Sequence, residues 1–137
     1  MGHYGMVIPR FVEQAMTGQD LTIFGDGKQS RCFCNVGDTV EALVRIADEG
    51  SCVGEIINIG STEEISIEDL AAKVIEITGS ESGMSYIAYE EAYADGFEDM
   101  RRRVPDTRRI EEHIGWGAKI SLDETIEQVW KNMESER

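Results

Sequence analysis

The feature that most constrains the fold is that four segments show the apolar spacing of an amphipathic helix. They are residues 7–18, 37–50, 66–79 and 121–133. Pro9 suits the first turn of a helix and Gly18 suits its end. Ser121 and Glu124 have the spacing of a capping box. The chain is therefore expected to contain at least these helices, each with one face turned toward a core.

The segment 37–50 is expected to begin at Asp38, which together with Glu41 resembles a capping box. Its periodicity predicts a buried apolar stripe of Val40, Leu43, Val44 and Ala47. A shorter helix is expected from Asp106 to about His113, ending at Gly115.

Short β-branched and aromatic runs lie between the helical segments: "LTIFG", "RCFCNV", "EIINIG" and "SYIAY". The first two flank the turn "GDGKQS", in which Gly25 and Gly27 tolerate positive φ, and this arrangement predicts a β-hairpin. The turn leads to a strand and not to a helix, so it is not the glycine fingerprint of a dinucleotide-binding fold. The fold class is predicted to be α/β (α+β): a small helix-rich domain with short strands, lacking a Rossmann half.

The composition limits the partners that the chain can have. With 137 residues it is expected to form one domain, and 27 acidic against 13 basic residues give a net charge of -14. Such a field repels nucleic acid and anionic membranes, so neither is an expected partner. Three cysteines and two histidines show no metal-ligand spacing, which predicts reduced thiols, no metal site and a cytoplasmic protein. The acidic segment 90–100 is expected to be a surface loop.

Phe24 and Arg31 are the first candidate site residues. Phe24 ends an apolar run just before the turn, where its ring could lie against a flat base. Arg31 opens the next run, and a guanidinium can bind two phosphate oxygens at once. The alternatives are core packing for Phe24 and surface solvation for Arg31.

Asn58 lies within the apolar run "EIINIG", where a polar amide needs hydrogen-bond partners or a ligand. Its alternative role is to satisfy nearby backbone groups. The run "RRRVPD", from Arg101 to Asp106, is a basic cluster that offsets the acidic field locally and favours an anion site over simple solvation.

Taken in order, several stretches of the chain resemble a known family. They are "YGMVIPRFVEQAMTGQDLTIFGDGKQSRCFCNVGDTVEALVRI", "INIGSTEEISIEDLAAKVIEITG", "RRRVPDTRRIEEHIGW" and "ISLDETIEQVW". This order resembles the C-terminal part of the NAD-dependent nucleotide-sugar epimerases and dehydratases, in the extended short-chain dehydrogenase/reductase family, with UDP-glucose 4-epimerase-like proteins as the nearest type. The similarity runs from about Tyr4 to about Met133.

The resemblance implies that residues 1–137 form the substrate domain, which holds the nucleoside diphosphate of a UDP- or dTDP-linked sugar. It implies a wall near the base for Val7 and Ile8, contact with the base for Phe24, and diphosphate binding for Arg31. Asn58 is implied to lie near the diphosphate. A further diphosphate contact is implied for Arg101 or Arg102, with Arg102 preferred.

The family's chemistry lies in its N-terminal half, which carries a glycine-rich NAD-binding fingerprint and a Tyr-x-x-x-Lys pair. No tyrosine of this chain has a lysine four residues later. The chain is therefore expected to lack the dinucleotide-binding domain, to bind no cofactor alone, and to be catalytically inactive alone. Two alternatives stay open: one chain of a two-chain enzyme with a separately encoded Rossmann chain, or a relic domain with an interaction role. The resemblance implies that the "EIINIG" strand lines up with the family's large parallel sheet. Without that neighbour the strand is expected to be an edge that pairs with itself or with a partner, or that the chain covers locally.

Overall fold

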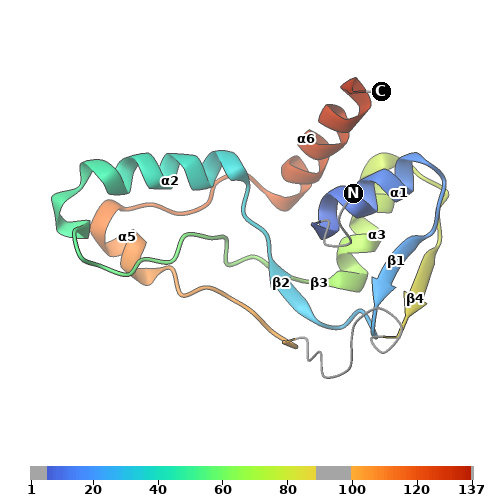
Figure 1. Cartoon of the computed structure of the whole chain (residues 1–137), viewed down its shortest axis with the longest axis horizontal. Coiled ribbons are helices and arrows are strands. Elements are labelled where there is room, and N and C mark those ends of the chain that lie inside the picture. Colours follow the sequence, from blue (N-terminus) through green and yellow to red (C-terminus); the bar gives the residue numbers. More distant parts are fainter. Residues whose placement is uncertain (1–5, 89–99, 137) are drawn as a thin grey trace.

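The predicted mixture of helices and short strands is confirmed by the computed structural model, which describes residues 6–88 and 100–136. All but the last residue of the acidic segment predicted as a loop lies outside these ranges. The described elements, in chain order, are α1 (Val7–Met16), β1 (Leu21–Phe24), β2 (Ser30–Cys32), α2 (Val36–Asp48), the 3-10 turn η1 (Gly50–Cys52), β3 (Glu64–Ser66), α3 (Ile67–Thr78), β4 (Met84–Ile87), α5 (Arg108–Ile114) and α6 (Leu122–Ser135) (Figure 1).

Most helix ends lie where the sequence predicts them, because the capping side chains make their expected bonds. Ser66 accepts a hydrogen bond from the Asp69 amide at the start of α3. Both reciprocal bonds of the Ser121–Glu124 capping box are present at the start of α6. Gly115 ends α5 in the left-handed region at φ 58°. Within the described ranges, no helix has the length and apolar character needed to cross a membrane.

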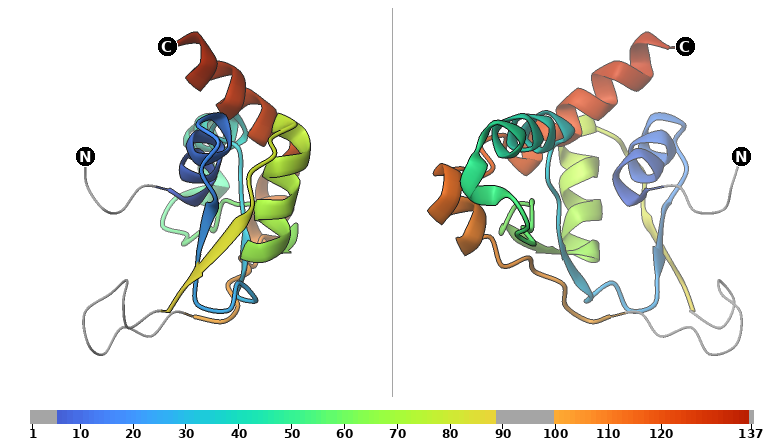
Figure 2. Two further views of the ribbon diagram at one scale, coloured as in Figure 1. Left: turned by 90° about the vertical axis from the view of Figure 1, so that its right-hand side faces the viewer. Right: turned by 60° about the vertical axis from the view of Figure 1, so that its left-hand side comes forward.

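The larger core lies between α1, α3, α6 and β1, at the end of the molecule opposite α2 and α5 (Figures 1 and 2). Its fully buried side chains include Phe11 and Val12 of α1, Leu70 of α3 and Ile126 of α6. These are the faces that the helical spacing predicts for α1, α3 and α6. Burial of such side chains is the main force that holds these three helices together.

The predicted hairpin is wrong, because β1 and β2 pair with strands distant in the sequence. β1 pairs in parallel with β4, and β2 pairs antiparallel with β3. The turn between them does use positive φ, 71° at both Gly25 and Gly27, but it separates the two strands instead of joining them in a ladder. The run "EIINIG" is also not a strand, since residues 55–60 have no assigned helix or strand and no sheet partner among the described residues.

A second, smaller core joins α2 to α5. It consists of buried Ala42, Ile110 and Trp116, with Ile57 and Ile59 packed against them. The start of α2 differs from its prediction, because Asn35 caps the helix and Asp38 does not. The carboxylate of Asp38 is buried and accepts the amides of Lys119 and Ile120 at 3.0 and 2.9 Å.

The stripe predicted to be buried on α2 is exposed. Val40, Leu43 and Val44 have exposed fractions of 53%, 54% and 58%. The helix meets the rest of the chain through the side that carries Ala42 instead. The periodicity therefore predicts the helix α2 correctly, but the residues predicted to be buried on it face solvent.

Candidate functional site

A cavity of about 450 Å³ lies between the start of α1, the chain from β2 into α2, and one side of α6. Its lining is mostly apolar, with a few amide and hydroxyl groups and one charged side chain. The described residues that line it are Met6, Val7, Ile8, Pro9, Arg31, Phe33, Cys34, Asn35, Val36, Thr125, Gln128, Val129 and Asn132. Three residues that the sequence predicts as site residues, Val7, Ile8 and Arg31, thus share one cavity.

The walls of this cavity are held by Asn35. Its side-chain oxygen accepts the Gly37 amide at 2.8 Å and caps α2. Its amide nitrogen donates to Thr125 Oγ1 at 3.1 Å and to Gln128 Oε1 at 2.9 Å, both on α6. Since one buried side chain fixes the start of α2 against α6, the cavity is preformed and does not need to be assembled by a ligand.

Arg31 is the only charged group among the described residues of the lining. Its backbone pairs with Ile65 in the β2–β3 ladder, and its Nη1 donates to the carbonyl of Ser30 at 2.7 Å. The chain has 27 acidic residues, yet no described lining residue is acidic. A half-buried guanidinium among apolar groups interacts more strongly with an anion than one in open water.

Phe24 lies beside α1 but does not line the cavity. The guanidinium carbon of Arg10 lies 4.5 Å from the centre of its ring, and Arg10 Nη2 donates to the Thr22 carbonyl at 3.0 Å. Arg10 lies one helical turn after Val7 on α1. The contact between Arg10 and the Phe24 ring therefore connects Phe24 to the helix that forms one wall of the cavity. Whether its ring contacts a base stays a prediction.

One arginine of the basic cluster, Arg102, is held against β2 and β3. Ser30 forms a parallel bridge with Arg102, and its amide donates to the Arg101 carbonyl at 2.9 Å. The Arg102 guanidinium makes a forked contact with Glu64, with Nε and Nη2 each 2.9 Å from a carboxylate oxygen. It also holds the pKa of that carboxyl below its usual range. Because side chains alternate along a strand, Ser30, Glu64 and Arg102 share the face opposite Arg31.

The two remaining arginines of the cluster differ in their partners. Arg101 forms an ion pair with Asp26 at 2.6 Å. The structure records no hydrogen bond or ion pair between Arg103 and any described residue. Arg101 and Arg102 thus bind Asp26 and Glu64, and none of the three arginines of the cluster is among the described residues of the cavity lining.

Asn58 lies outside the cavity, in a separate hollow of about 340 Å³ lined by Ile56, Asp106, Arg108, Arg109 and Glu112. Its Nδ2 donates to the Asp106 carbonyl at 3.1 Å. The Arg108 guanidinium lowers the pKa of the Asp106 carboxyl to about 2. This contact agrees with the alternative role of Asn58, in which its side chain satisfies a nearby backbone group.

The sequence reasoning missed the contribution of α6 and of Phe33. Thr125, Gln128, Val129 and Asn132 line the cavity at the spacing of one helical face. Phe33 follows Arg31 by two residues, so strand alternation already places the two on one side. Helical spacing alone could not distinguish a cavity-lining polar face on α6 from a solvated one.

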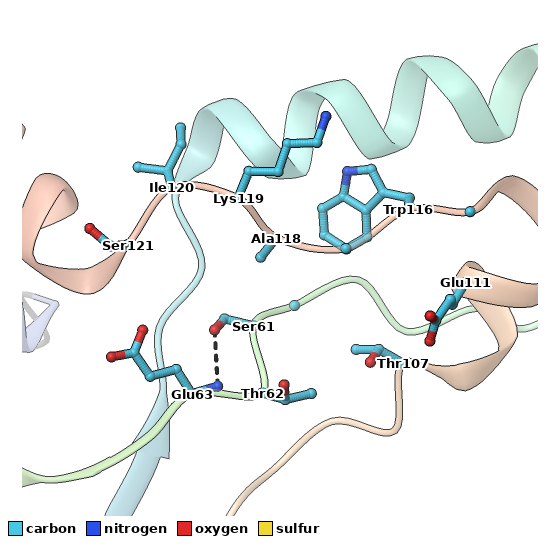
Figure 3. Close-up of a pocket in the computed structure, with 13 residues that line it drawn as sticks. Ser61, Thr62, Glu63, Thr107, Glu111, Trp116, Ala118, Lys119, Ile120 and Ser121 are labelled. Atoms are coloured by element: carbon cyan, nitrogen blue, oxygen red, sulfur yellow. Dashed lines mark hydrogen bonds between the residues drawn. The ribbon is translucent and has the colours of Figure 1, made fainter.

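A second large cavity, of about 590 Å³, lies between residues 60–63 and residues 115–121. Figure 3 shows Ser61, Thr62 and Glu63 facing the segment from Trp116 to Ser121, with Glu111 at one end. Its only described cation, Lys119, is 3.2 Å from Glu41. Two carboxylates, Glu63 and Glu111, line it and disfavour an anion there.

Comparison with known proteins identifies the family of the chain. The family model of GDP-mannose 4,6 dehydratase matches residues 3–129. The chain belongs to the extended short-chain dehydrogenase/reductase family. Within this family it is 40% identical to a UDP-N-acetyl-alpha-D-glucosaminuronate decarboxylase of Bacillus cytotoxicus. The aligned region of 127 residues covers 93% of the chain and 39% of that decarboxylase. The chain is also 32% identical to UDP-glucuronic acid decarboxylase 1 of Xenopus tropicalis, over 89% of its length and 27% of that protein.

A solved structure of this family has the same fold. UDP-glucose 4-epimerase of Thermotoga maritima, determined with UDP-glucose, superposes with a TM-score of 0.85 and is 28% identical, over 98% of the chain and 42% of the epimerase. The relatives include decarboxylases as well as an epimerase, so the comparisons agree on the family and not on one reaction. The chain spans about two fifths or less of the length of each of these relatives.

Structures of this family have been determined with NAD, among them a dTDP-glucose 4,6-dehydratase of Bacillus anthracis. The glycine turn of this chain does not have the arrangement of a dinucleotide-binding turn. The glycine turn Gly25–Gly27 follows β1 but leads into β2, whereas a dinucleotide-binding turn leads into a helix whose N-terminus faces the pyrophosphate. The described residues also contain no group of three or more metal-ligating side chains.

Proposed function

We propose that this chain binds the nucleoside diphosphate part of a nucleotide sugar in the cavity between α1, β2 and α6. The observation that carries the proposal is that Arg31 lines the same mostly apolar cavity as Val7 and Ile8, beside the amide side chains of Asn35, Gln128 and Asn132. A guanidinium in such surroundings fits a diphosphate. Apolar walls with a few convergent polar groups fit a base and ribose.

Three of the relatives support uridine as the base, because the two decarboxylases are named for UDP-sugars and the Thermotoga maritima epimerase was determined with UDP-glucose. In this proposal Val7 and Ile8 form the wall beside the base and Arg31 binds the diphosphate. Phe24 extends the base site along α1. Arg101 is a further proposed contact of the diphosphate, which it would gain by leaving its ion pair with Asp26. Arg102 and Asn58 remain proposed contacts that a ligand would gain only by displacing Glu64 and the Asp106 carbonyl.

Titration of the chain with UDP, followed by amide chemical shifts, tests this proposal. We expect shifts in α1, β2 and the α6 residues that line the cavity. Arg31→Ala is expected to weaken UDP binding about tenfold to a hundredfold, because charge-assisted hydrogen bonds contribute about 1.5–3 kcal/mol. The matched control is Arg108→Ala, which removes an exposed arginine far from the cavity lining and is expected to leave binding unchanged.

Two results would contradict the proposal. One is the absence of shifts in the cavity at millimolar UDP. The other is an equal loss of affinity in Arg31→Ala and Arg108→Ala, which would reflect the general charge of the chain. Far-UV circular dichroism of both variants shows whether the fold is retained.

A second candidate function is that of one chain of a two-chain NAD-dependent enzyme, inactive until a dinucleotide-binding polypeptide completes it. The support is that no tyrosine of these 137 residues is followed by a lysine at the fourth position, so these residues do not themselves supply a Tyr-x-x-x-Lys pair. We expect no turnover of UDP-sugars with NAD by the chain alone. Turnover by the chain alone would contradict this candidate without affecting the proposed nucleotide site.

A further inference from the structure

The α6 wall of the cavity is joined to the start of α2 by side-chain hydrogen bonds whose direction is fixed at one end. The backbone amide of Gly37 can only donate, so the Asn35 atom that it meets at 2.8 Å is the acceptor Oδ1. The Nδ2 group of Asn35 is therefore turned toward α6, which begins close to the start of α2 (Figure 1). Asn35 is buried and cannot reverse this orientation without losing the cap of α2.

This direction passes from Asn35 to two residues of α6. Nδ2 donates to Thr125 Oγ1 at 3.1 Å and to Gln128 Oε1 at 2.9 Å. The Thr125 hydroxyl itself donates to the Ser121 carbonyl at 2.9 Å, so toward Asn35 it can only accept. The carbonyl oxygen of Gln128 is likewise occupied, and the structure records no acceptor for Gln128 Nε2 among the described residues. Since Gln128 lines the cavity, the α6 wall presents an N–H donor there.

Arg31 and Gln128 are suited to different parts of an elongated ligand. The chain runs in one direction from β2 to the start of α2 (Figure 1). An extended chain advances about 3.3 Å per residue, so Arg31 and Asn35 lie up to about 13 Å apart. Phe33 lies between them and also lines the cavity. The cavity thus has a cation, an apolar middle and an oriented amide, and a nucleotide carries its phosphates and its base at opposite ends.

An oriented donor distinguishes between bases that differ in one group. Uracil carries a carbonyl oxygen at ring position 4, which accepts a hydrogen bond. Cytosine carries an amino group at that position, which donates one. With its oxygen held by Asn35, the amide of Gln128 cannot turn to accept from cytosine. Two donors would then face each other after the ligand has displaced water, and a polar group left unpaired in this way weakens binding.

We propose that Gln128 is a specificity-determining residue of the nucleotide site, and that its Nε2 donates to the 4-carbonyl oxygen of the base. It would thereby select a uracil or thymine nucleotide over a cytosine nucleotide. The inference rests on the function proposed above, that this cavity binds a nucleoside diphosphate. Arg31 cannot supply this selection, because UDP and CDP carry the same diphosphate. Asn35 is a positioning residue, which holds Gln128 in the donating orientation.

Isothermal titration of the chain with UDP and with CDP tests the proposal. The ratio of the two dissociation constants cancels every effect on the ribose and diphosphate that the ligands share. We expect the unchanged chain to bind UDP about fivefold to a hundredfold more tightly than CDP. Gln128→Leu removes the donor without adding a charge and is expected to bring the ratio close to one. Gln128→Glu still accepts from Asn35 but presents an acceptor to the base, and is expected to favour CDP.

Two further variants separate selection from charge and from positioning. Asn132→Asp is the matched control for Gln128→Glu, because it places the same charge one helical turn later in the same lining. It is expected to weaken UDP and CDP by the same factor and to leave their ratio unchanged. Asn35→Asp still accepts the Gly37 amide but cannot donate to Gln128. The freed amide can turn, so the ratio is expected to fall toward one.

Circular dichroism shows whether each variant keeps its fold. Gln128 is exposed, so its variants are expected to fold even where Asn35→Asp does not. Equal affinities of the unchanged chain for UDP and CDP would overturn the inference, as would a ratio that Gln128→Leu leaves unchanged. In both cases UDP still shifts the amides of the cavity, so the proposed function stands and the role of Gln128 fails. Binding of neither nucleotide by the unchanged chain contradicts the proposed function itself, and this inference with it.

Discussion

At the scale of single residues, Arg31 and Phe24 are proposed to contact chemically different parts of one ligand. A guanidinium binds phosphate oxygens whatever base is attached. An aromatic ring contributes only when a flat group lies against it. The two contributions are therefore separable with ligands that carry one part and lack the other.

Phe24→Ala is expected to weaken UDP binding about twofold to tenfold, because an aromatic contact contributes about 0.5–1.5 kcal/mol. It is expected to leave the binding of inorganic pyrophosphate unchanged, whereas Arg31→Ala weakens both. Isothermal titration with the two ligands measures this difference. An equal loss for UDP and pyrophosphate in Phe24→Ala would indicate that Phe24 acts only by placing Arg10, which lies over its ring.

At the scale of elements, Glu64 on β3 holds β2 and the segment at Arg102 together. Its carboxylate accepts the Arg102 fork and the Ser30 hydroxyl. Both hydrogen bonds favour the charged form and lower the folded-state pKa of Glu64 from its ordinary value of 4.5, with the Arg102 contact as the larger cause. These contacts fix the β2–β3 ladder and its bridge to Arg102, and so position the strand that carries Arg31.

The Glu64 contacts predict a loss of stability in acid. Because the folded-state pKa is lowered, the contribution is fully present above about pH 4.5 and is lost as the pH falls through the folded-state value. Arg102→Gln is expected to raise the pKa of Glu64 and to reduce this part of the acid dependence. Carboxyl NMR titration measures the pKa, and Arg108→Gln is the control. A Glu64 pKa that is the same in the unchanged chain and in Arg102→Gln would contradict the prediction.

The helices were predictable from the sequence because their signals are local. Ser66, Ser121 and Gly115 act within one turn of the helix end that they define. The strand pairing was not predictable, because β1 and β2 have sequence neighbours that suggest a hairpin but partners more than thirty residues away. β3 has only three residues, too few for a periodic signal.

The candidate site was predictable only in part, for a similar reason. Arg31, Val7 and Ile8 could be singled out by residue type and family resemblance, and the structure places them in one cavity. Gln128 and Asn132 could not be singled out in this way. The sequence pattern of a polar helix face is the same whether or not a cavity lies beside it. Whether any of these residues binds a ligand stays a prediction.

At the scale of the whole molecule, the described residues form two cores of unequal size. The larger contains twelve buried residues from α1, β1, α3 and α6, and the smaller contains three around Trp116. The smaller core carries α2, whose apolar residues face water. A region with few buried contacts and an uncovered apolar face opens at a lower free energy than the rest.

The two tryptophans allow this difference to be measured, because each reports on one core. Trp116 lies in the smaller core and Trp130 packs against the larger one. Trp130→Phe keeps the native reporter of the smaller core, and Trp116→Phe keeps that of the larger core. In the isolated chain, the fluorescence of Trp116 is expected to change at a lower urea concentration than that of Trp130, since the smaller core unfolds first. Coincident transitions in the two variants would instead show a single cooperative unit.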